Sequence, residues 1–265
     1  MGLHEVLSGR DVVFVTHWHP AHGNHGDRLL RDASLQMFRK VGASVRAVVA
    51  GDVAFPPRLD IGPITTIVIS GGGNLGGYYY PEDGTFGLRI ADRYPGAPVQ
   101  ILPQTYVRPW SDEGRRLADR VLSRDNVWVC LREGVSWYYF DRDYHKGWVE
   151  QDTVMEYYDV PDVKKTADRL FIRRRDNESR LVFPGDAWTA WPYDEIVPRI
   201  GRWRRVVTDR LHAAILGYRL GCEVWLVANS YFKNAAYYEK WWKSESRVRF
   251  LGEQSDVESF LREQA

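Results

Sequence analysis

The sequence predicts an α/β protein built from two doubly wound parallel sheets, and three observations support this fold class. Short runs of β-branched and apolar residues alternate with amphipathic stretches along the chain. The predicted strands are continuously apolar, which is typical of a parallel sheet covered by helices on both faces. A length of 265 residues corresponds to about two domains of roughly 150 residues each.

The N-terminal half shows the clearest alternation of strands and helices. Residues 11–16 (DVVFVT) form a buried apolar run, and residues 27–41 place five apolar side chains on one helical face. Residues 111–123 have the same helical character. Further strands are predicted at residues 44–50, 64–70, 98–105 and 127–132.

A second series of strand-like runs begins near residue 168, and it reads RLFIRR, RLVFPG, RVVTDR, EVWLVAN and RVRFLG. Residues 141–167 are more polar and less periodic, and they contain Pro161. We therefore expect the domain boundary at residue 163, within about ten residues. The predicted domains are residues 1–163 and 164–265, with a cleft between them.

Composition and charge exclude several classes of protein. Lys plus Arg number 36 and Asp plus Glu number 35, so the net charge of +1 lacks the broad positive field typical of nucleic-acid binding. No run approaches the ~18 apolar residues of a membrane span, and the N-terminus does not resemble a signal peptide. With two cysteines beside apolar runs, we expect a cytoplasmic protein with buried thiols. The basic, Trp-rich residues 240–250 leave peripheral contact with the inner membrane face open, although a core-packing helix followed by a strand is the preferred interpretation.

The histidine-rich residues 16–27 (THWHPAHGNHGD) raise the alternative of a zinc site. His17, His19 and His22 have the spacing of the metallo-β-lactamase-type hydrolases. That signature carries Asp immediately before the third His, where this chain has Ala21, and it usually follows several strands. Spacing alone does not make ligands converge on an ion. We therefore expect histidines in a solvated loop and no metal.

Polar motifs follow four of the five strands predicted in the N-terminal half. The first is the turn at residues 23–27 (GNHGD), for which helix capping is the structural alternative. Three glycines at 71–73 follow the strand at 64–70 and expose backbone N–H groups to an anion, or else form a plain turn. The pattern lacks the GxGxxG spacing of a nicotinamide dinucleotide site. Gln104 and Arg132 lie at the ends of the next two strands, and four such ends at one sheet edge suggest a ligand site.

Residues 207–234 carry the most informative segment. A strand leads into a helix whose first turn holds Asp209, Arg210, Leu211 and His212. Arg and His at a helix N-terminus favour binding of a dianion. Lys233 follows the next strand and is expected to approach the same place. The structural alternative is that Asp209 caps the helix and the cations are solvated.

At this point the sequence resembles the polysaccharide pyruvyl transferase family. Six or seven motifs in the family's order carry the resemblance: GNHGD (23–27), GGGNL (71–75), PQT (103–105), REGVS (132–136), RRRDNES (173–179), TDRLHAAIL (208–216) and NSYFKN (229–234). The resemblance implies a GT-B-like fold, that is, two Rossmann-like domains with the site between them. It also implies transfer of a pyruvyl group from phosphoenolpyruvate to two hydroxyls of a sugar, with formation of a ketal and release of phosphate.

The resemblance assigns Arg210, Leu211, His212 and Arg132 to the phosphoenolpyruvate site. Lys233 and the backbone of Gly71, Gly72 and Gly73 are expected to complete it. The donor phosphate is assigned to the C-terminal domain, residues 164–265. We further expect substrate contacts from three amide side chains, those of Asn24, Asn74 and Gln104. His212 is the candidate general acid, because an imidazole titrates near neutral pH. Asp27, from the other domain, is the candidate that orients or deprotonates an acceptor hydroxyl.

The scheme requires no cofactor, because phosphoenolpyruvate is a co-substrate, and no metal. The expected partners are this donor and a sugar or glycan acceptor, with a lipid-linked acceptor left open. Three alternatives stay open: a GT-B glycosyltransferase that uses a nucleotide sugar, a zinc-dependent hydrolase, and a non-catalytic carbohydrate-binding protein suggested by the 11 Trp residues.

Overall fold

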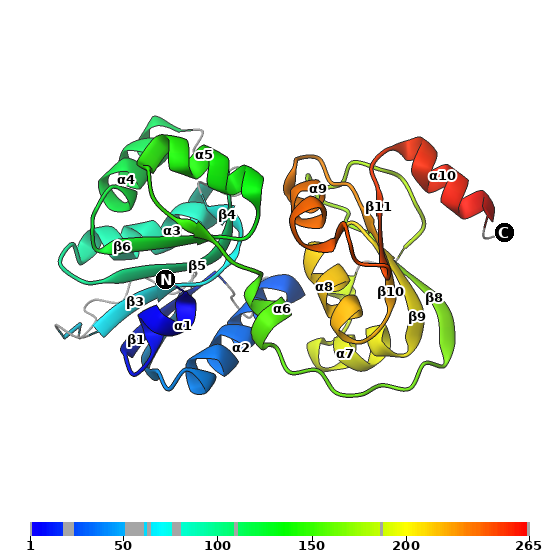
Figure 1. Ribbon diagram of the computed structural model, residues 1–265, viewed down its shortest axis with the longest axis horizontal. Coiled ribbons are helices and arrows are strands. Elements are labelled where there is room, and N and C mark those ends of the chain that lie inside the picture. The colour runs from blue at the N-terminus through cyan, green and yellow to red at the C-terminus, as the bar shows by residue number, and fades with distance from the viewer. Residues whose placement is uncertain are drawn as a thin grey trace. The chain divides into compact units, whose positions relative to one another are not determined.

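The computed structural model describes residues 2–17, 24–50, 61–62, 65–75, 81–108, 111–185 and 188–263. The chain forms two compact units, Met1–Tyr158 (unit 1) and Asp159–Ala265 (unit 2). Each unit is built on a sheet whose strand pairs are all parallel (Figure 1). The predicted α/β class with parallel sheets is therefore confirmed. The division between the units lies five residues before the predicted position 163.

In the sheet of unit 1, the order of the strands reverses near the centre. Its order is β2-β1-β3-β5-β6-β7, with β4 paired to β5. Because the order reverses between β1 and β3, the loops after these two strands flank the position where open parallel sheets bind ligands. The strands are β1 (Asp11–Thr16), β2 (Ser44–Ala50), β3 (Thr65–Ile69), β4 (Gly72–Leu75), β5 (Val99–Tyr106), β6 (Val127–Leu131) and β7 (Trp148–Val149).

Helices cover both faces of this sheet, so unit 1 is doubly wound as predicted. On one face Val13 packs in a cluster with side chains of α3 and α4, and on the other Phe14 packs with α1 and α2. Helix α2 begins two residues before the predicted start, because the Asn24 side chain accepts the Gly26 N–H at 3.1 Å and caps the helix. The helices are α1 (Leu3–Leu7), α2 (His25–Lys40), α3 (Pro81–Arg93), α4 (Asp112–Leu122), α5 (Gly134–Tyr144) and α6 (Thr153–Tyr157).

Unit 2 has strands that follow one another in space as they do in sequence. Its order is β11-β10-β9-β8, so right-handed crossovers place α7, α8 and α9 on one face (Figure 1). Helix α10 lies on the opposite face. The elements are β8 (Ala167–Ile172), the 3-10 helix η2 (Trp188–Ala190), α7 (Tyr193–Gly201), β9 (Trp203–Thr208), α8 (Leu211–Arg219), β10 (Glu223–Val227), α9 (Lys233–Tyr237), the π-helix η3 (Tyr238–Trp242), β11 (Val248–Leu251) and α10 (Gln254–Glu263).

The strand predicted from RLVFPG, residues 180–185, is wrong. Leu181 and Phe183 are buried and Val182 is 62% exposed, so the alternation is that of a strand. The backbone of Val182, however, pairs with the side-chain amide of Gln254: its N–H donates to Oε1 at 2.9 Å, and its carbonyl accepts from Nε2 at 3.1 Å. This side chain takes the place of a partner strand, and Pro184 supplies no N–H for a ladder.

The Trp-rich residues 240–250 form part of η3 and the strand β11. Trp242 is buried, which agrees with the core-packing interpretation. Among the residues that the structure describes, no helix combines the length and the apolar character that crossing a membrane requires.

Candidate functional site

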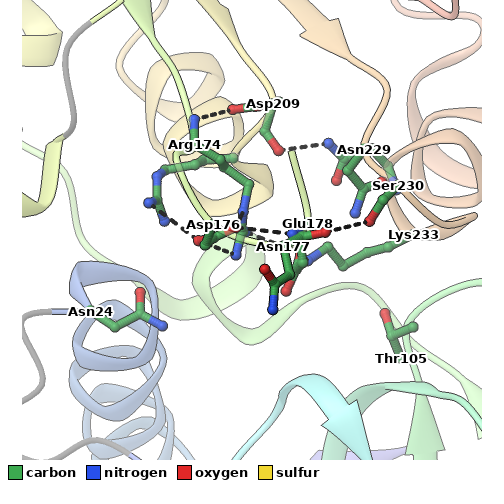
Figure 2. Close-up of polar contacts among 12 residues, drawn as sticks. Asn24, Thr105, Arg174, Asp176, Asn177, Glu178, Asp209, Asn229, Ser230 and Lys233 are labelled. Carbon is green, nitrogen blue, oxygen red and sulfur yellow. Dashed lines mark hydrogen bonds and ion pairs between the residues drawn. The ribbon is translucent and has the colours of Figure 1, made fainter. Parts of the chain in front are cut away.

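Three loops meet at the carboxyl edge of the unit 2 sheet (Figure 2). Residues 173–179 follow β8, residues 209–210 follow β9, and residues 228–232 follow β10. Ser179 and Asn229 form an antiparallel bridge, and the Ser230 N–H donates to the Glu178 carbonyl at 2.9 Å. These contacts fix the first loop to the third, and the side chains of the three loops therefore form one group.

We call this group the charged cluster, and Arg174 lies at its centre. Its guanidinium binds Asp176 in a bidentate manner, with Nε–Oδ1 at 2.8 Å and Nη2–Oδ2 at 2.9 Å, and Nη1 lies 3.1 Å from Oε2 of Glu178. The Lys233 ammonium donates to the same Glu178 oxygen. The cluster consists of Arg174, Asp176, Glu178, Asp209, Arg210 and Lys233.

Two carboxylates of the cluster are held in the ionised form. Burial opposes ionisation of Asp176, but Arg174 and Arg210 outweigh it and lower its pKa. Burial likewise acts against Glu178, and Lys233 and Arg174 lower its pKa on balance. The charge-assisted bonds thus hold Arg174 and Lys233 in place before any ligand arrives.

Arg210 is buried to all but 8% of its surface and is the N-cap of α8. Its backbone N–H donates to Oγ1 of Thr208 at 3.0 Å. Its guanidinium lies over the Trp188 ring at 5.9 Å and is 3.7 Å from Oδ2 of Asp176, beyond hydrogen-bond distance. Within the described part of the chain, its Nε has no hydrogen-bond partner. Arg210 is therefore the cation of the cluster that is least committed to internal contacts.

Asp209 has no exposed surface. Its Oδ1 accepts the Arg174 N–H at 2.7 Å, and its backbone carbonyl accepts from Nδ2 of Asn234 at 2.9 Å. Asn234 also donates to the Val227 carbonyl at 2.9 Å and so joins the ends of β9 and β10. Burial raises the pKa of Asp209 to about 6, although Arg174 and Arg210 act against this shift.

Four of the residues predicted for the donor site lie here. Arg210 and Lys233 are linked through Asp176, Arg174 and Glu178. Leu211, the first residue of α8, is buried in the core, and His212 is half-buried in the same first helical turn.

Arg174, Asp176, Glu178 and Asp209 were not predicted as site residues. RRRDNES (173–179) was noted only as a family motif. Capping by Asp209 was only the structural alternative, and the structure makes Arg210 the N-cap of α8. A usable signal was present, since RRRDNES places several charges directly after a predicted strand, where loops of a parallel sheet converge.

Arg132, predicted to bind the donor, lies in unit 1 and is 1% exposed. Its Nη1 lies 3.1 Å from Asp152 Oδ2, and its Nε donates to Thr105 Oγ1 at 2.8 Å. Glu133 accepts from the Thr105 and Ser136 hydroxyls in the same enclosed network. These contacts join the ends of β5 and β6 to α5 and α6, so the structure gives Arg132 a bracing role, and its contact with a donor stays a prediction.

Asn24 and Asp27 lie at the start of α2. Asn24 Nδ2 donates to Asp27 Oδ2 at 2.6 Å, while Asn24 Oδ1 accepts from Gly26. This arrangement fixes the first turn of α2, with Asn24 as the N-cap. It accounts for both side chains structurally, and their roles toward an acceptor stay predictions.

The glycine run is shaped by the neighbouring strand. A Cβ on Gly71 would lie 2.7 Å from the Pro103 carbonyl oxygen, and Gly72 has a φ of +153°. Gln104 donates from Nε2 to the Ser70 carbonyl at 2.6 Å, and Gly72 is paired with Gln104 in the β4–β5 ladder. The predicted turn at 71–73 is thus partly a short strand, and close packing is one reason for its glycines. Gly73 is half-buried in that strand; the side chain of Asn74 lies outside the described residues.

The histidine loop is covered in part. His17 follows β1, whereas His19 and His22 lie outside the described residues. Among the residues that are described, no three His, Cys, Asp or Glu side chains are grouped as ligands for a metal ion.

Comparison with known proteins adds evidence of another kind. The family model described as polysaccharide pyruvyl transferase matches residues 24–147. The protein named "Putative pyruvyl transferase EpsO" of Bacillus subtilis (strain 168) is 24% identical over an alignment of length 305. The alignment covers 97% of this chain and 94% of that protein. A crystal structure of a functionally uncharacterised protein from Klebsiella pneumoniae subsp. pneumoniae NTUH-K2044 has a similar fold, with a TM-score of 0.67 and 21% identity over 92% of this chain and 94% of its own.

Proposed function

We propose that this chain, which matches the polysaccharide pyruvyl transferase family model over residues 24–147, transfers a pyruvyl group from phosphoenolpyruvate to a sugar of a polysaccharide or glycan precursor. The product is a cyclic ketal, and the second product is phosphate.

The observation that carries the choice of donor is the convergence of Arg174, Arg210 and Lys233 in one cluster, in which Arg210 and Lys233 are buried. Phosphoenolpyruvate carries a phosphate and a carboxylate on the same carbon, C2. Cations that are already oriented and shielded from water bind such an anion more strongly than exposed ones. Arg210 is the first candidate for contact with the donor, because its Nε lacks a hydrogen-bond partner in the described structure.

The chemistry requires a proton on the methylene carbon of the donor. As that C–H bond forms from the double-bond electrons, C2 becomes electrophilic and accepts the oxygen of one sugar hydroxyl. The C2–O bond to phosphate then breaks, and a second hydroxyl attacks C2 and closes the ring. The two hydroxyl protons balance the proton used at the methylene carbon and the proton bound by the departing phosphate.

We assign the role of proton donor to His212. It lies in the first turn of α8, two residues after Arg210. Replacement His212→Gln should preserve much of the donor affinity while lowering turnover about 10²–10⁴-fold, the usual contribution of general acid catalysis. Arg210→Ala should instead weaken donor binding, because it removes a charge-assisted bond. Phosphate release and donor affinity are measured on both variants, after thermal melting has shown that each is folded. Near-normal turnover in His212→Gln would assign the proton to another group.

A glycosyltransferase that uses a nucleotide sugar would share the parallel sheets, so ligand binding must separate the two functions. Thermal unfolding is followed with phosphoenolpyruvate and, separately, with nucleoside diphosphates. A ligand at 100 times its dissociation constant stabilises the folded state by about 2.7 kcal/mol. Stabilisation by phosphoenolpyruvate alone supports pyruvyl transfer, and stabilisation by nucleoside diphosphates alone contradicts it.

The proposed setting is the cytoplasm. Cys130 and Cys222 are both free and buried, as expected in a reducing compartment. Fractionation of cells tests the location, and flotation with liposomes tests contact with a membrane surface. Recovery of the protein only from an extracytoplasmic fraction would contradict this part of the proposal.

A further inference from the structure

The Asp209 carboxyl is enclosed, yet only part of its hydrogen-bonding capacity is used within the described structure. Oδ1 accepts the Arg174 N–H at 2.7 Å, whereas Oδ2 has no hydrogen-bond partner among the described residues. A carboxylate that is removed from water and not fully compensated is costly in its ionised form. Asp209 therefore differs from Asp176 and Glu178, whose oxygens bind cations directly.

Other polar atoms beside Asp209 are in a similar condition. In the part of the chain that the structure describes, Nε of Arg210, Nδ2 of Asn229 and Oδ1 of Asn234 are buried without a hydrogen-bond partner. Two of these are donors, on the residues that follow β9 and β10. Buried polar atoms are normally paired, so their accumulation at one sheet edge points to a ligand that completes them.

The groups around Asp209 define its electrostatic surroundings. Arg174, Asp176 and Glu178 belong to the loop after β8, Arg210 precedes α8, His212 lies in the first turn of α8, and Lys233 begins α9. In the absence of a ligand the cations favour an ionised Asp209, while burial opposes it. An anion bound to Arg174, Arg210 or Lys233 would oppose that cationic influence and add a negative charge nearby. Both changes favour protonation.

We propose that binding of an anionic donor at the charged cluster is coupled to the uptake of one proton from solvent by Asp209. The proton binds to Oδ2, and no other bond forms or breaks. The protonated carboxyl is uncharged, so it no longer repels the anion. Its O–H also adds a hydrogen-bond donor. The identity of the donor rests on the proposed function, but the coupling requires only an anion.

Calorimetry tests the coupling directly. Phosphoenolpyruvate and sulfate are each titrated into the whole protein near pH 7, in two buffers that differ in ionisation enthalpy, so that the number of protons taken up is measured. Sulfate is included because it stays a dianion over the working range, whereas the phosphate of phosphoenolpyruvate itself titrates. The wild type should take up close to one proton more than Asp209→Asn with either ligand. Asp168→Asn, at a side chain that is 59% exposed in the same unit, should match the wild type.

The pH dependence of sulfate binding provides a second test. Above the pKa of Asp209 in the free protein, one coupled proton makes the dissociation constant rise about tenfold per pH unit. Asp209→Asn should lack this slope between pH 6 and 8. If the Asn variant does not fold, infrared spectra of the wild type replace it, because sulfate should produce the C=O band of a protonated carboxyl.

The outcomes separate the coupling from the function. Proton uptake with sulfate but no binding of phosphoenolpyruvate would support the coupling and contradict the proposed donor. Equal proton numbers in the wild type and Asp209→Asn would overturn the coupling and leave the donor intact. Failure of both anions to bind would overturn both.

Discussion

The two sheets place the same residue types at their carboxyl edges, but they use them differently. In unit 1, Arg132 is 1% exposed and is enclosed by Asp152, Thr105 and Glu133. In unit 2, Arg210 is 3.7 Å from Asp176 and retains an Nε without a hydrogen-bond partner in the described structure. An arginine after a parallel strand is thus a brace where carboxylates enclose it and a candidate ligand contact where they do not.

The largest expected effect is on the stability of unit 1. Arg132→Met should lower the free energy of unfolding by about 3–5 kcal/mol, because it leaves buried carboxylates without their cation. Chemical denaturation monitored by tryptophan fluorescence measures the change. The double variant Arg132→Met, Asp152→Leu is the control and should recover part of the loss. If Arg132→Met were as stable as the wild type but bound anions poorly, Arg132 would be a ligand contact and not a structural brace.

The pH dependence of stability should distinguish Asp209 from the other carboxylates. Its pKa is about 6 in the folded protein and about 3.9 when unfolded. The folded state therefore binds the proton of Asp209 more tightly than the unfolded state does. The resulting stabilisation of the folded protein is complete below pH 4 and is lost as the pH rises through 6. The expected loss between those limits is about 3 kcal/mol. The free energy of unfolding is measured for the wild type and for Asp209→Asn from pH 4.5 to 7.5. The difference between the two proteins isolates the contribution of Asp209 from that of other titrating groups. A difference that does not vary with pH would contradict this prediction.

Arg210→Met should show the opposite pattern to Arg132→Met. Loss of one charged hydrogen bond to a ligand corresponds to about 1.5–3 kcal/mol, or roughly 10–150-fold in affinity for phosphoenolpyruvate. The melting temperature should change little, because the guanidinium is 3.7 Å from its carboxylate. Lys240→Met, at an exposed lysine in η3, serves as a control for loss of one positive charge. Equal affinities in Arg210→Met and Lys240→Met would remove Arg210 from the site.

The smallest effect is expected at the start of α2. Asn24→Ala should lower stability by about 1 kcal/mol, as expected for loss of an N-cap. Asn24→Ser should restore the cap. If turnover stays low in Asn24→Ser while stability recovers, the amide of Asn24 has a role toward a substrate in addition to capping.

Local sequence patterns predicted much of the framework. The apolar runs at 11–16 and 127–132 became β1 and β6, and Ser111 marked the start of α4, where its hydroxyl accepts from Gly114 at 3.0 Å. These elements depend on neighbours in sequence. The strand prediction for residues 180–185 failed because their backbone binds the side chain of Gln254. That residue lies more than 70 residues later, and no local pattern reveals the contact.

The candidate site was predictable in position but not in its pairings. The expectation that polar residues gather where parallel strands end led to Arg210 and Lys233. It did not show that Glu178 joins Lys233 to Arg174, or that Asp152 encloses Arg132. Whether a charge is available or neutralised depends on contacts across 20 to 55 residues of sequence, and burial of Asp209 depends on the packing of three strands.

The sequential strand order of unit 2 has a consequence for synthesis on the ribosome. Strands β8 to β11 can pair in the order in which they emerge, because neighbours in the sheet are neighbours in the chain. One face, however, includes Val207 and Trp225, and its cover comes from Val257 and Phe260 of α10. This apolar face therefore stays incomplete until α10 has emerged from the exit tunnel, and a nascent chain stalled before α10 would leave it uncovered.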